Sequence, residues 1–530
     1  MTNARRTATD GRKTTHRRRR TARKPVVASL AAVTLLAGAW YATAATLNSV
    51  SEGSEAGGGG GTAAAEASAT TSTEALATAS GTPAGTAAAS PTPTPTPTPT
   101  ATAKASAAAK AATGTLAVTN TTVTLSAKFP YLSAGYNNTR EWTRTTTAVA
   151  PNGTLRVAWP ASDGIHVTPL TAAGKRSAAD TVVKGAKEVG GLVAHNDGFA
   201  LLTRVADTNK WKETAAALVR YTNGKQTFVT KLTGTASHDT APLLDGQLTW
   251  NGTKYGTYFV VHGAGGFADG HFGDKLAYVS AKGTKLSGGW GWGCSHNEGI
   301  ALHAEATGAF TSLCFDDWRS GLFVSTGIGA PDTAPAVQRE QCWAGYCGGT
   351  FAGRTGELVK SSTGRYATAF GSRGAASAAK NPQDASGRGW TVKPKTTTHQ
   401  VAVAFLKTRN TPAGKPVYLT NTPGTEHVNV HIAPYGKDRL LVSWETLKNA
   451  KCASGTCTGT FTGTHLRLID WNGKFQSADK VVTARITGDI AVQKDGSLTW
   501  AYAPVTPSYA SPLTGASPTT TTLRIARLKP

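Results

Sequence analysis

The sequence predicts an all-β fold, a seven-bladed β-propeller over residues 114–530, and three observations support this prediction. From residue 114 onward, short β-rich runs alternate with glycine turns, and long helical periodicity is absent. One turn between apolar strands recurs seven times, with its glycines 45 to 72 residues apart. The chain also ends one strand short of a complete seventh unit. The seven turns are Asn152-Gly153, Asp197-Gly198, Asn251-Gly252, Thr307-Gly308, Thr363-Gly364, Tyr435-Gly436 and Asp495-Gly496.

Each unit has the pattern of a four-stranded blade. A second glycine turn follows each of the first six, because glycine accepts the positive φ that such hairpins require. The seventh unit stops after a third strand, Thr522–Leu528, and the strand Leu116–Lys128 from the start of the domain would complete it. Such closure removes open sheet edges. Six or eight blades, or a pair of β-sandwiches, remain alternatives. The second turns are at Gly174, Gly224, Gly283, Gly329, Gly414 and Gly473.

The N-terminus predicts export. Residues 1–25 form a basic arm, and ten Lys and Arg in its first 24 residues stand against one acid, Asp10. Residues 26–45 carry no charge and would span roughly 30 Å as a helix. Since basic residues stay in the cytoplasm, we expect the rest of the chain on the extracellular face of the membrane or secreted. The segment is either a single-pass anchor, favoured by Trp40-Tyr41 at its outer end, or a cleaved signal peptide.

Residues 46–113 are predicted to be a disordered linker, because they are almost wholly Ala, Thr, Gly, Ser and Pro. The glycine run at 57–61 is typical of a flexible coil. The Pro-Thr repeat at 91–100 favours polyproline II, which at about 3.1 Å per residue makes a stiffer spacer. The linker is therefore interpreted as a stalk between membrane and propeller.

Charge indicates the class of partner. The chain has a formal net charge of +24, most of it in residues 114–530. This excess favours anionic wall polymers, acidic glycans or lipid headgroups, although a generally basic soluble surface is the alternative. Nucleic acid is not expected, since no recognition module is present and the compartment is wrong. We expect a monomer.

The topology of a propeller predicts on which of its two faces each loop lies. Connections between blades, and loops between second and third strands, emerge on one side, here called the loop face; the tight turns emerge on the other, the hairpin face. The irregular segments fall largely on the loop face, which is where scaffolds commonly carry function. These segments are 206–214, 262–275, 287–297, 315–320, 335–350, 371–399 and 445–460.

All six cysteines fall on or near the loop face. An even number in an exported chain predicts three local disulfides, and zinc binding by the C-x4-C pairs is the weaker alternative. Cys294 and Cys314 lie about opposite each other across the turn at Thr307-Gly308. The remaining candidates are Cys342 with Cys347 and Cys452 with Cys457.

The chemically richest stretch runs from the third predicted blade into the fourth. Exposed tryptophan faces stack on sugars, and Asp, His and Arg hold their hydroxyls. The same Asp and His side chains would suit a divalent metal or acid–base chemistry, while the alternative is that glycines, Trp and His simply fill the tops of blades. No resident cofactor is otherwise predicted, and no catalytic residue is assigned. The candidate ligand-binding residues are His262, Asp269, His271, Asp274, Trp290, Trp292, His296, Asp316, Asp317, Trp318 and Arg319.

This stretch resembles secreted bacterial propeller-like proteins of uncharacterised function. The shared features are a G-H-x-G-D loop, here residues 270–274, and a W-x-W-G-C-S-H connection, here residues 290–296. The resemblance covers about 40 residues and implies a shared site without a known activity.

Elsewhere the sequence is less specific. In residues 426–431 alternation puts His427, Asn429 and His431 on one strand face, as a metal site or, more commonly, a polar surface. The absence of G-x-S-x-G, Walker, Rossmann and H-E-x-x-H patterns disfavours those enzyme classes. We therefore expect a surface-displayed or secreted module that binds glycan or anionic envelope polymer. A polysaccharide hydrolase or lyase and a protein–protein scaffold are the alternatives.

Overall fold

The computed structural model describes most of the predicted globular part, and the basic arm, residues 26–45 and the linker lie outside the described residues. Within the described part, no helix has the length and apolarity needed to cross a membrane. The description covers residues 116–530 except 135–139, 209–212, 243, 266–269, 295–298, 317–320, 325–356, 384–388, 454–455, 507 and 510–514.

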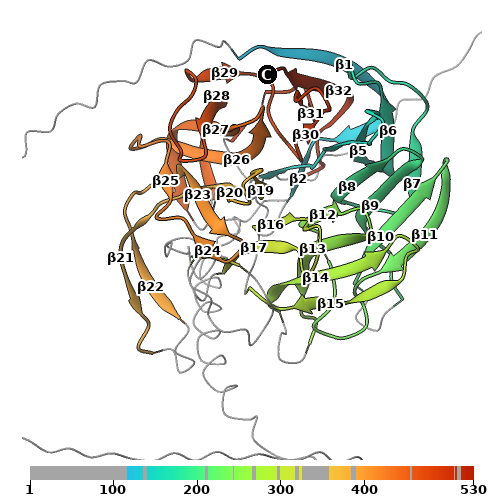
Figure 1. Ribbon diagram of the computed structural model, residues 1–530, viewed down its shortest axis with the longest axis horizontal. Helices are drawn as coiled ribbons and strands as arrows, with labels where there is room; N and C mark the ends of the chain where they lie inside the picture. Colours follow the sequence, from blue (N-terminus) through green and yellow to red (C-terminus); the bar gives the residue numbers. More distant parts are fainter. Residues whose placement is uncertain are drawn as a thin grey trace, which may run out of the picture. The chain divides into compact units, whose positions relative to one another are not determined.

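Seven antiparallel sheets stand around a common axis, as the sequence predicts (Figure 1). In each sheet the strand that comes first in the blade lies innermost (Figure 1). The first strands of blades 1 to 4 contact one another in turn, as do those of blades 5 and 6 and those of blades 7 and 1. Blade 1 is β4(Thr146–Val149), β5(Leu155–Ala161), β6(Gly164–Leu170) and β7(Thr181–Lys184); blade 2 is β8(Val189–His195), β9(Gly198–Val205), β10(Ala215–Thr222) and β11(Lys225–Lys231); blade 3 is β12(Gly246–Trp250), β13(Lys254–His262), β14(Phe272–Ser280) and β15(Lys285–Gly291).

The second half of the ring has the same plan with two variations. Blade 4 has three strands among the described residues, and two short strands share the outer edge of blade 5. Blade 4 is β16(Ile300–His303), β17(Thr311–Asp316) and β18(Gly321–Val324); blade 5 is β19(Val359–Lys360), β20(Tyr366–Ser372), β23(Gln400–Thr408), β24(Thr411–Pro412) and β25(Val417–Tyr418); blade 6 is β26(Glu426–Tyr435), β27(Arg439–Ala453), β28(Thr456–Asp470) and β29(Lys480–Val482); blade 7 is β30(Ala491–Val492), β31(Leu498–Tyr502), β32(Thr519–Leu528) and β1(Val118–Pro130).

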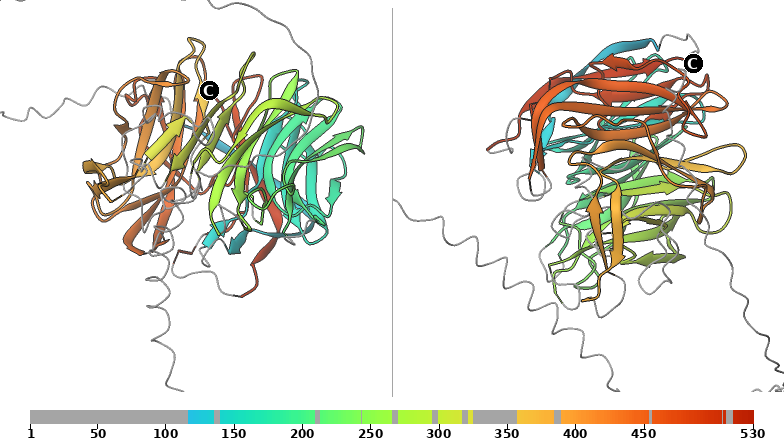
Figure 2. Two further views of the ribbon diagram at one scale, coloured as in Figure 1. Left: turned by 90° about the horizontal axis from the view of Figure 1, so that it is seen from below. Right: turned by 90° about the vertical axis from the view of Figure 1, so that its left-hand side faces the viewer.

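The ring closes as expected, with the two ends of the domain in one blade. β1 pairs antiparallel with β32 from Val118 opposite Leu528 to Pro130 opposite Thr519. Both views in Figure 2 show sheets standing side by side about the axis. β1 therefore covers the edge of β32, and one ladder holds the two ends of the domain together.

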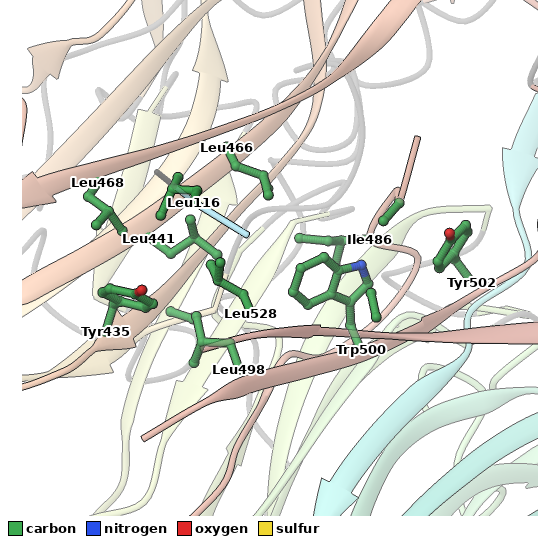
Figure 3. Close-up of a cluster of buried hydrophobic side chains, with 13 residues drawn as sticks. Leu116, Tyr435, Leu441, Leu466, Leu468, Ile486, Leu498, Trp500, Tyr502 and Leu528 are labelled. Carbon is green, nitrogen blue, oxygen red and sulfur yellow. The ribbon is translucent and has the colours of Figure 1, made fainter. Parts of the chain in front are cut away.

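Packing between blades forms the core. Seven clusters of buried apolar side chains occur, one between each neighbouring pair of blades. Figure 3 shows the cluster between blades 6 and 7, where Leu441 and Leu466 face Leu498 and Trp500. Because both faces of each sheet are covered, β9 is buried at six consecutive positions, whereas the outermost strand β11 is largely exposed.

The predicted turns are confirmed at the described glycines, and Gly329 lies outside the described residues. Gly153 has φ +88° and Gly174 has φ +77°, values that favour glycine. The glycines of all seven first turns have positive φ: Gly153, Gly198, Gly252, Gly308, Gly364, Gly436 and Gly496.

Two segments expected to be irregular are more regular than predicted. Within 371–399, β21(Ala375–Lys380) and β22(Trp390–Pro394) form a separate hairpin. Within 445–460, β27 and β28 continue past the sheet as a long ribbon that pairs as far as Ala453 opposite Thr456. Neither was predicted, because these Ala-, Lys- and Thr-rich strands lack the alternating apolar residues of a buried face. A further short hairpin is β2(Leu132–Ala134) with β3(Arg140–Trp142).

Candidate functional site

The strand register puts two of the predicted loops, 262–275 and 287–297, at one edge of blade 3. The segment 335–350 lies outside the described residues, and only part of the predicted residue set is described. β13 ends and β14 begins at the pair His262 and Phe272, and β15 ends at Gly291 opposite Lys275. The loop 263–271 and the connection after Gly291 therefore leave the blade at the same edge. The predicted residues that lie outside the described part of the chain are Asp269, His296, Asp317, Trp318 and Arg319.

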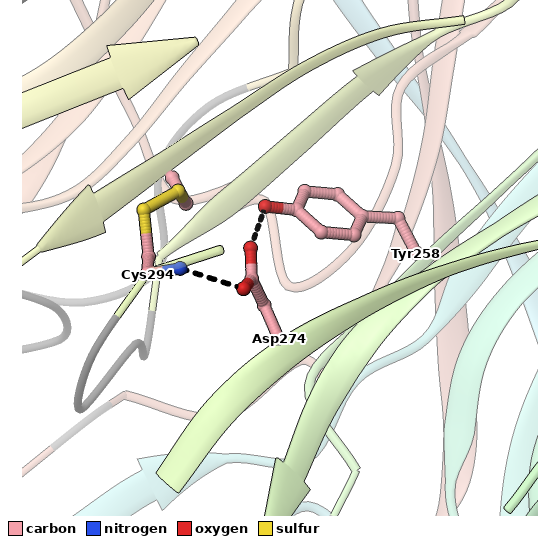
Figure 4. Close-up of a disulfide and its surroundings, with 4 residues drawn as sticks. Tyr258, Asp274 and Cys294 are labelled. Carbon is pink, nitrogen blue, oxygen red and sulfur yellow. Dashed lines mark hydrogen bonds between the residues drawn. A yellow bond between two sulfur atoms is a disulfide. The ribbon is translucent and has the colours of Figure 1, made fainter. Parts of the chain in front are cut away.

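Asp274 is a core group. Its side chain is fully buried, and it accepts hydrogen bonds from the Tyr258 hydroxyl and from the backbone N of Cys294, the latter at 2.8 Å (Figure 4). Burial raises the pKa of Asp274 to about 6, and the nearby Asp316 carboxylate raises it further. The hydrogen bonds that Asp274 accepts lower this pKa and so oppose the rise. Asp316 itself is 3% exposed. Neither carboxyl group is open to a ligand in this conformation.

The two described tryptophans of the set pack against blade 3. Trp292 donates from Nε1 to the His238 carbonyl at 2.7 Å, and its ring lies where a Cβ on Gly273 would be 2.5 Å away. Trp290 makes an edge contact with Tyr258, with ring centroids 5.3 Å apart. These contacts are those of residues that fill the top of a blade.

The predicted histidines differ in surroundings. The Nδ1 atom of His262 lies 3.2 Å from Oε1 of Glu213, whose other oxygen accepts a hydrogen bond from Thr240. His271 is exposed at the end of the same loop. The partner Glu213 was not foreseen, because it lies in a different blade.

Disulfides account for both close groups of metal-ligand atoms found among the described residues. The predicted Cys294–Cys314 disulfide is present, and its sulfurs lie with Asp274 in one group. The second group joins His399 and Glu426 to Cys457, which is also disulfide-bonded. A sulfur in a disulfide is not a thiolate, so neither group offers a complete metal site in this redox state. Cys342 and Cys347 lie outside the described residues, and Cys452 stands opposite Cys457 in the β27–β28 ladder.

A different polar cluster lies at the propeller axis. Arg144, just before β4, donates from Nη1 to the carbonyls of Gly190 and Gly246 and from Nη2 to Asp489 at 2.6 Å. These partners belong to the starts of the first strands of blades 2, 3 and 7. Only the axis is near all of them, and inner strands begin at the loop face. Arg144 is 6% exposed, whereas the side chain of Asp489 is 23% exposed.

Blades 5 and 6 contribute the rest of this cluster. Glu357, just before β19, accepts from the backbone N of Ile490 at 3.4 Å and of Ile432 at 3.3 Å. Its Oε1 lies 3.5 Å from Nδ1 of His431, whose Nε2 is 3.1 Å from Oδ1 of Asn429. Burial alone would raise the pKa of Glu357, but His431 and the backbone N–H groups lower it below its usual value. We call Arg144, Glu357, Asn429, His431 and Asp489 the axial centre.

A bulge in β26 orients the side chains of Asn429 and His431. The register shifts between Val428 and His431, and Asn429 has φ +54°, which Asn tolerates better than most residues. The strict alternation predicted for this strand is therefore wrong. Asn429 and His431 still meet, but the Nδ1 atom of His427 lies instead 2.9 Å from the His399 carbonyl.

A buried ion pair supports the axial centre. Glu445 is fully buried and Arg485 is 1% exposed; Arg485 donates to Glu445 from Nε at 3.1 Å and also from Nη2. Asn429 and the Tyr509 hydroxyl donate to the same carboxylate, each at 2.7 Å. The Trp142 ring lies 3.3 Å from the Arg485 guanidinium carbon. Burial and the Glu445 charge raise the pKa of Tyr509, so this hydroxyl remains a donor at neutral pH.

This site was hard to predict from the sequence. Arg144, Glu357 and Asp489 are isolated residues separated by more than 130 positions, and no motif surrounds them. The only signal was the polar alternation in residues 426–431. The site could be found only once the blades were arranged about the axis.

Comparisons with known proteins identify no family: no protein-family model matches the chain, and no curated protein does. Among solved structures, a protein of unknown function from Dyadobacter fermentans matches with 10% identity and a TM-score of 0.37, covering 78% of this chain and 99% of that chain. An α-L-arabinanase of Penicillium chrysogenum complexed with arabinobiose has 11% identity, a TM-score of 0.34 and coverages of 77% and 98%. A thermostable family-43 glycoside hydrolase has 10% identity, a TM-score of 0.29 and coverages of 65% and 95%. Values this low assign no activity to this chain.

Proposed function

We propose that this protein displays a β-propeller outside the cell that binds glycan, with one end of the ligand entering the axial centre from the loop face. The uncharged segment 26–45 and the linker support display at or beyond the membrane, as an anchored or a secreted protein. No nucleic acid partner is proposed, and the ring is self-closed and proposed to act as a monomer.

One observation carries the glycan proposal. The Oδ1 atom of Asp489 binds Arg144, but its Oδ2 has no hydrogen bond to any described residue, and the side chain is 23% exposed. Beside it, Glu357 is 20% exposed, and its contacts with other described side chains and backbone groups are 3.3 to 3.5 Å long. The site thus offers acceptors to a ligand that brings donors, and a sugar carries a hydroxyl donor at most of its carbons.

Binding to a glycan array by the purified full-length chain tests this function. Asp489→Ala should reduce retention, because it removes the exposed acceptor and frees the buried Arg144. The matched control is Asp438→Ala, in the exposed β26–β27 turn on the hairpin face. Failure of the wild-type chain to bind any glycan would refute the proposal, as would equal loss in both variants.

Hydrolysis of the bound glycan is the second candidate. The lowered pKa of Glu357 keeps a partly exposed carboxylate ionised beside His431, as a general base or nucleophile requires. Release of reducing ends from a retained polysaccharide measures this activity. Glu357→Gln should abolish turnover while binding persists; undiminished turnover in that variant would remove the hydrolase candidate.

A further inference from the structure

We infer that the axial centre selects a glycan that carries a protonated amine, such as an unacetylated amino sugar, over neutral or acidic sugars. This inference rests on the proposed glycan binding and adds the chemical class of the ligand. It follows from two observations: the hydrogen-bond donors of the site are largely bound to protein acceptors, and the groups that stay exposed to a ligand are carboxylates.

The hydrogen-bond donors of the axial centre are largely bound to acceptors of the protein itself. Both hydrogens on Nδ2 of Asn429 are directed at protein acceptors, Glu445 Oε1 at 2.7 Å and the Ile486 carbonyl at 2.6 Å. Arg144 directs three of its five N–H donors at two carbonyls and Asp489, and the residue is only 6% exposed. The Tyr509 hydroxyl donates to Glu445. What a ligand meets is therefore acceptors, on Asp489 and Glu357.

The Nη1 group of Arg485 is out of reach of a ligand. It has no hydrogen-bond partner among the described residues, but the residue is 1% exposed and the Trp142 and Phe461 rings lie 3.3 Å and 5.5 Å from its guanidinium carbon. This arrangement is a cation–π contact inside the protein. Among the described residues, neither guanidinium group of the axial centre and its supporting pair is therefore accessible to a ligand carboxylate or phosphate.

Charge points to the same ligand. The axial centre and its supporting pair contain three carboxylates, Glu357, Glu445 and Asp489, against two guanidinium groups, Arg144 and Arg485. Carboxylates therefore outnumber guanidinium groups by one, and the two charged members most exposed to a ligand, Asp489 and Glu357, are both carboxylates. A hydrogen bond from an ammonium to a carboxylate is roughly twice as strong as one between neutral groups. An ammonium of the ligand would therefore gain more here than a hydroxyl, and an anionic sugar would be repelled.

The positive charge of the whole domain opposes binding of a cationic glycan elsewhere on the surface. Residues 114–530 carry most of the formal +24 of the chain, so a polycationic glycan is repelled by the general surface and can bind only at a local negative site. A divalent metal is a poorer match for the axial residues, because they belong to neither close group of ligand atoms found among the described residues. Binding of an amine-bearing glycan would thus report on the axial centre itself.

Three β-1,4-linked hexamers test the inference on the full-length chain by calorimetry: glucosamine, N-acetylglucosamine and glucose. The account expects the glucosamine hexamer to bind roughly tenfold or more tightly than the other two at pH 6, where its amines are largely protonated. Asp489→Asn keeps an oxygen for Arg144 but removes the charge, and it should abolish this difference. Glu357→Gln should reduce it, and Asp438→Asn on the hairpin face should leave it unchanged.

The outcomes separate the two proposals. Equal affinity for the three hexamers, or tighter binding of the neutral ones, overturns the amine inference and leaves glycan binding in place. Tight glucosamine binding that persists in both Asp489→Asn and Glu357→Gln overturns the axial assignment. If the chain binds none of the hexamers and no glycan on the array, both proposals fail.

Discussion

Asp274→Asn should change how stability depends on pH, because this buried carboxyl group prefers to be protonated. Its pKa is raised from 3.8 to about 6 in the folded chain, chiefly by burial. Ionisation of Asp274 therefore opposes folding. The protein is therefore most stable, as far as Asp274 is concerned, below pH 4, where this group is protonated in both the folded and the unfolded state. The free energy of unfolding falls as the pH rises from about 4 to about 6, and the effect of Asp274 is constant above that range. The rise in pKa corresponds to a loss of about 3 kcal/mol across the window.

An asparagine fits the site without carrying the charge. Its oxygen can accept from the Cys294 backbone N, and its amide can donate to the Tyr258 hydroxyl. Urea denaturation of both proteins, followed by tryptophan fluorescence, gives the free energy of unfolding at each pH. Between about pH 4 and pH 7, the variant should gain about 3 kcal/mol relative to wild type.

A second carboxyl group provides the control. The pKa of Asp495 is lowered, mainly by hydrogen bonds from Ser497 with help from Arg527, so its contribution is lost only as the pH falls below about 4. Asp495→Asn should therefore parallel wild type above pH 4. A constant difference between Asp274→Asn and wild type from pH 4 to pH 7 would refute the assignment of Asp274 as a protonated core group.

Four further changes test other parts of the structure. Replacing Cys294 and Cys314 with serine opens a 20-residue loop and should cost about 3 kcal/mol of unfolding free energy in urea, whereas no loss would mean that the disulfide does not constrain the chain. Glu445→Gln strips the buried Arg485 of its counter-charge and should cost about 3 to 5 kcal/mol, a loss that Arg485→Met in the same chain should partly restore. Gly488→Ala puts a Cβ 2.1 Å from the Thr145 carbonyl oxygen and should lower the melting temperature through a cost of about 2 kcal/mol, while Gly291→Ala, with nothing within 4 Å, should not. Deleting residues 1–130 removes β1 and should yield an aggregating chain by light scattering; a soluble monomer would contradict ring closure by β1.

Local signals were enough to predict the propeller. Turn glycines such as Gly153 and Gly364 specify hairpins through their positive φ, and these hairpins recur at blade-sized intervals. The incomplete seventh unit correctly indicated closure by the first strand. The Cys294–Cys314 bond followed from two residues placed about opposite across one turn, and the ladder confirms that Cys314 faces Ile300 at the start of that hairpin.

The axial centre could not be predicted in the same way. Glu357 and Ile490 are 133 positions apart, and their contact depends on how blades 5 and 7 face the axis. The tryptophans and carboxylates near residue 274 were conspicuous in sequence because they are adjacent, yet Asp274, Trp290 and Trp292 are largely engaged in packing. Neighbouring polar and aromatic residues in the sequence therefore led to a predicted site near residue 274. The residues of the axial centre were not predicted, because closure of the ring brings them together from distant parts of the chain.

A crystal structure of the chain with a bound glucosamine hexamer would examine the axial centre most directly. We expect sugar density on the loop face at the axis, with an amine nitrogen within about 3 Å of a carboxylate oxygen of Asp489 or Glu357. Density over Trp290 and Trp292 on blade 3, with the axial carboxylates untouched, would contradict it.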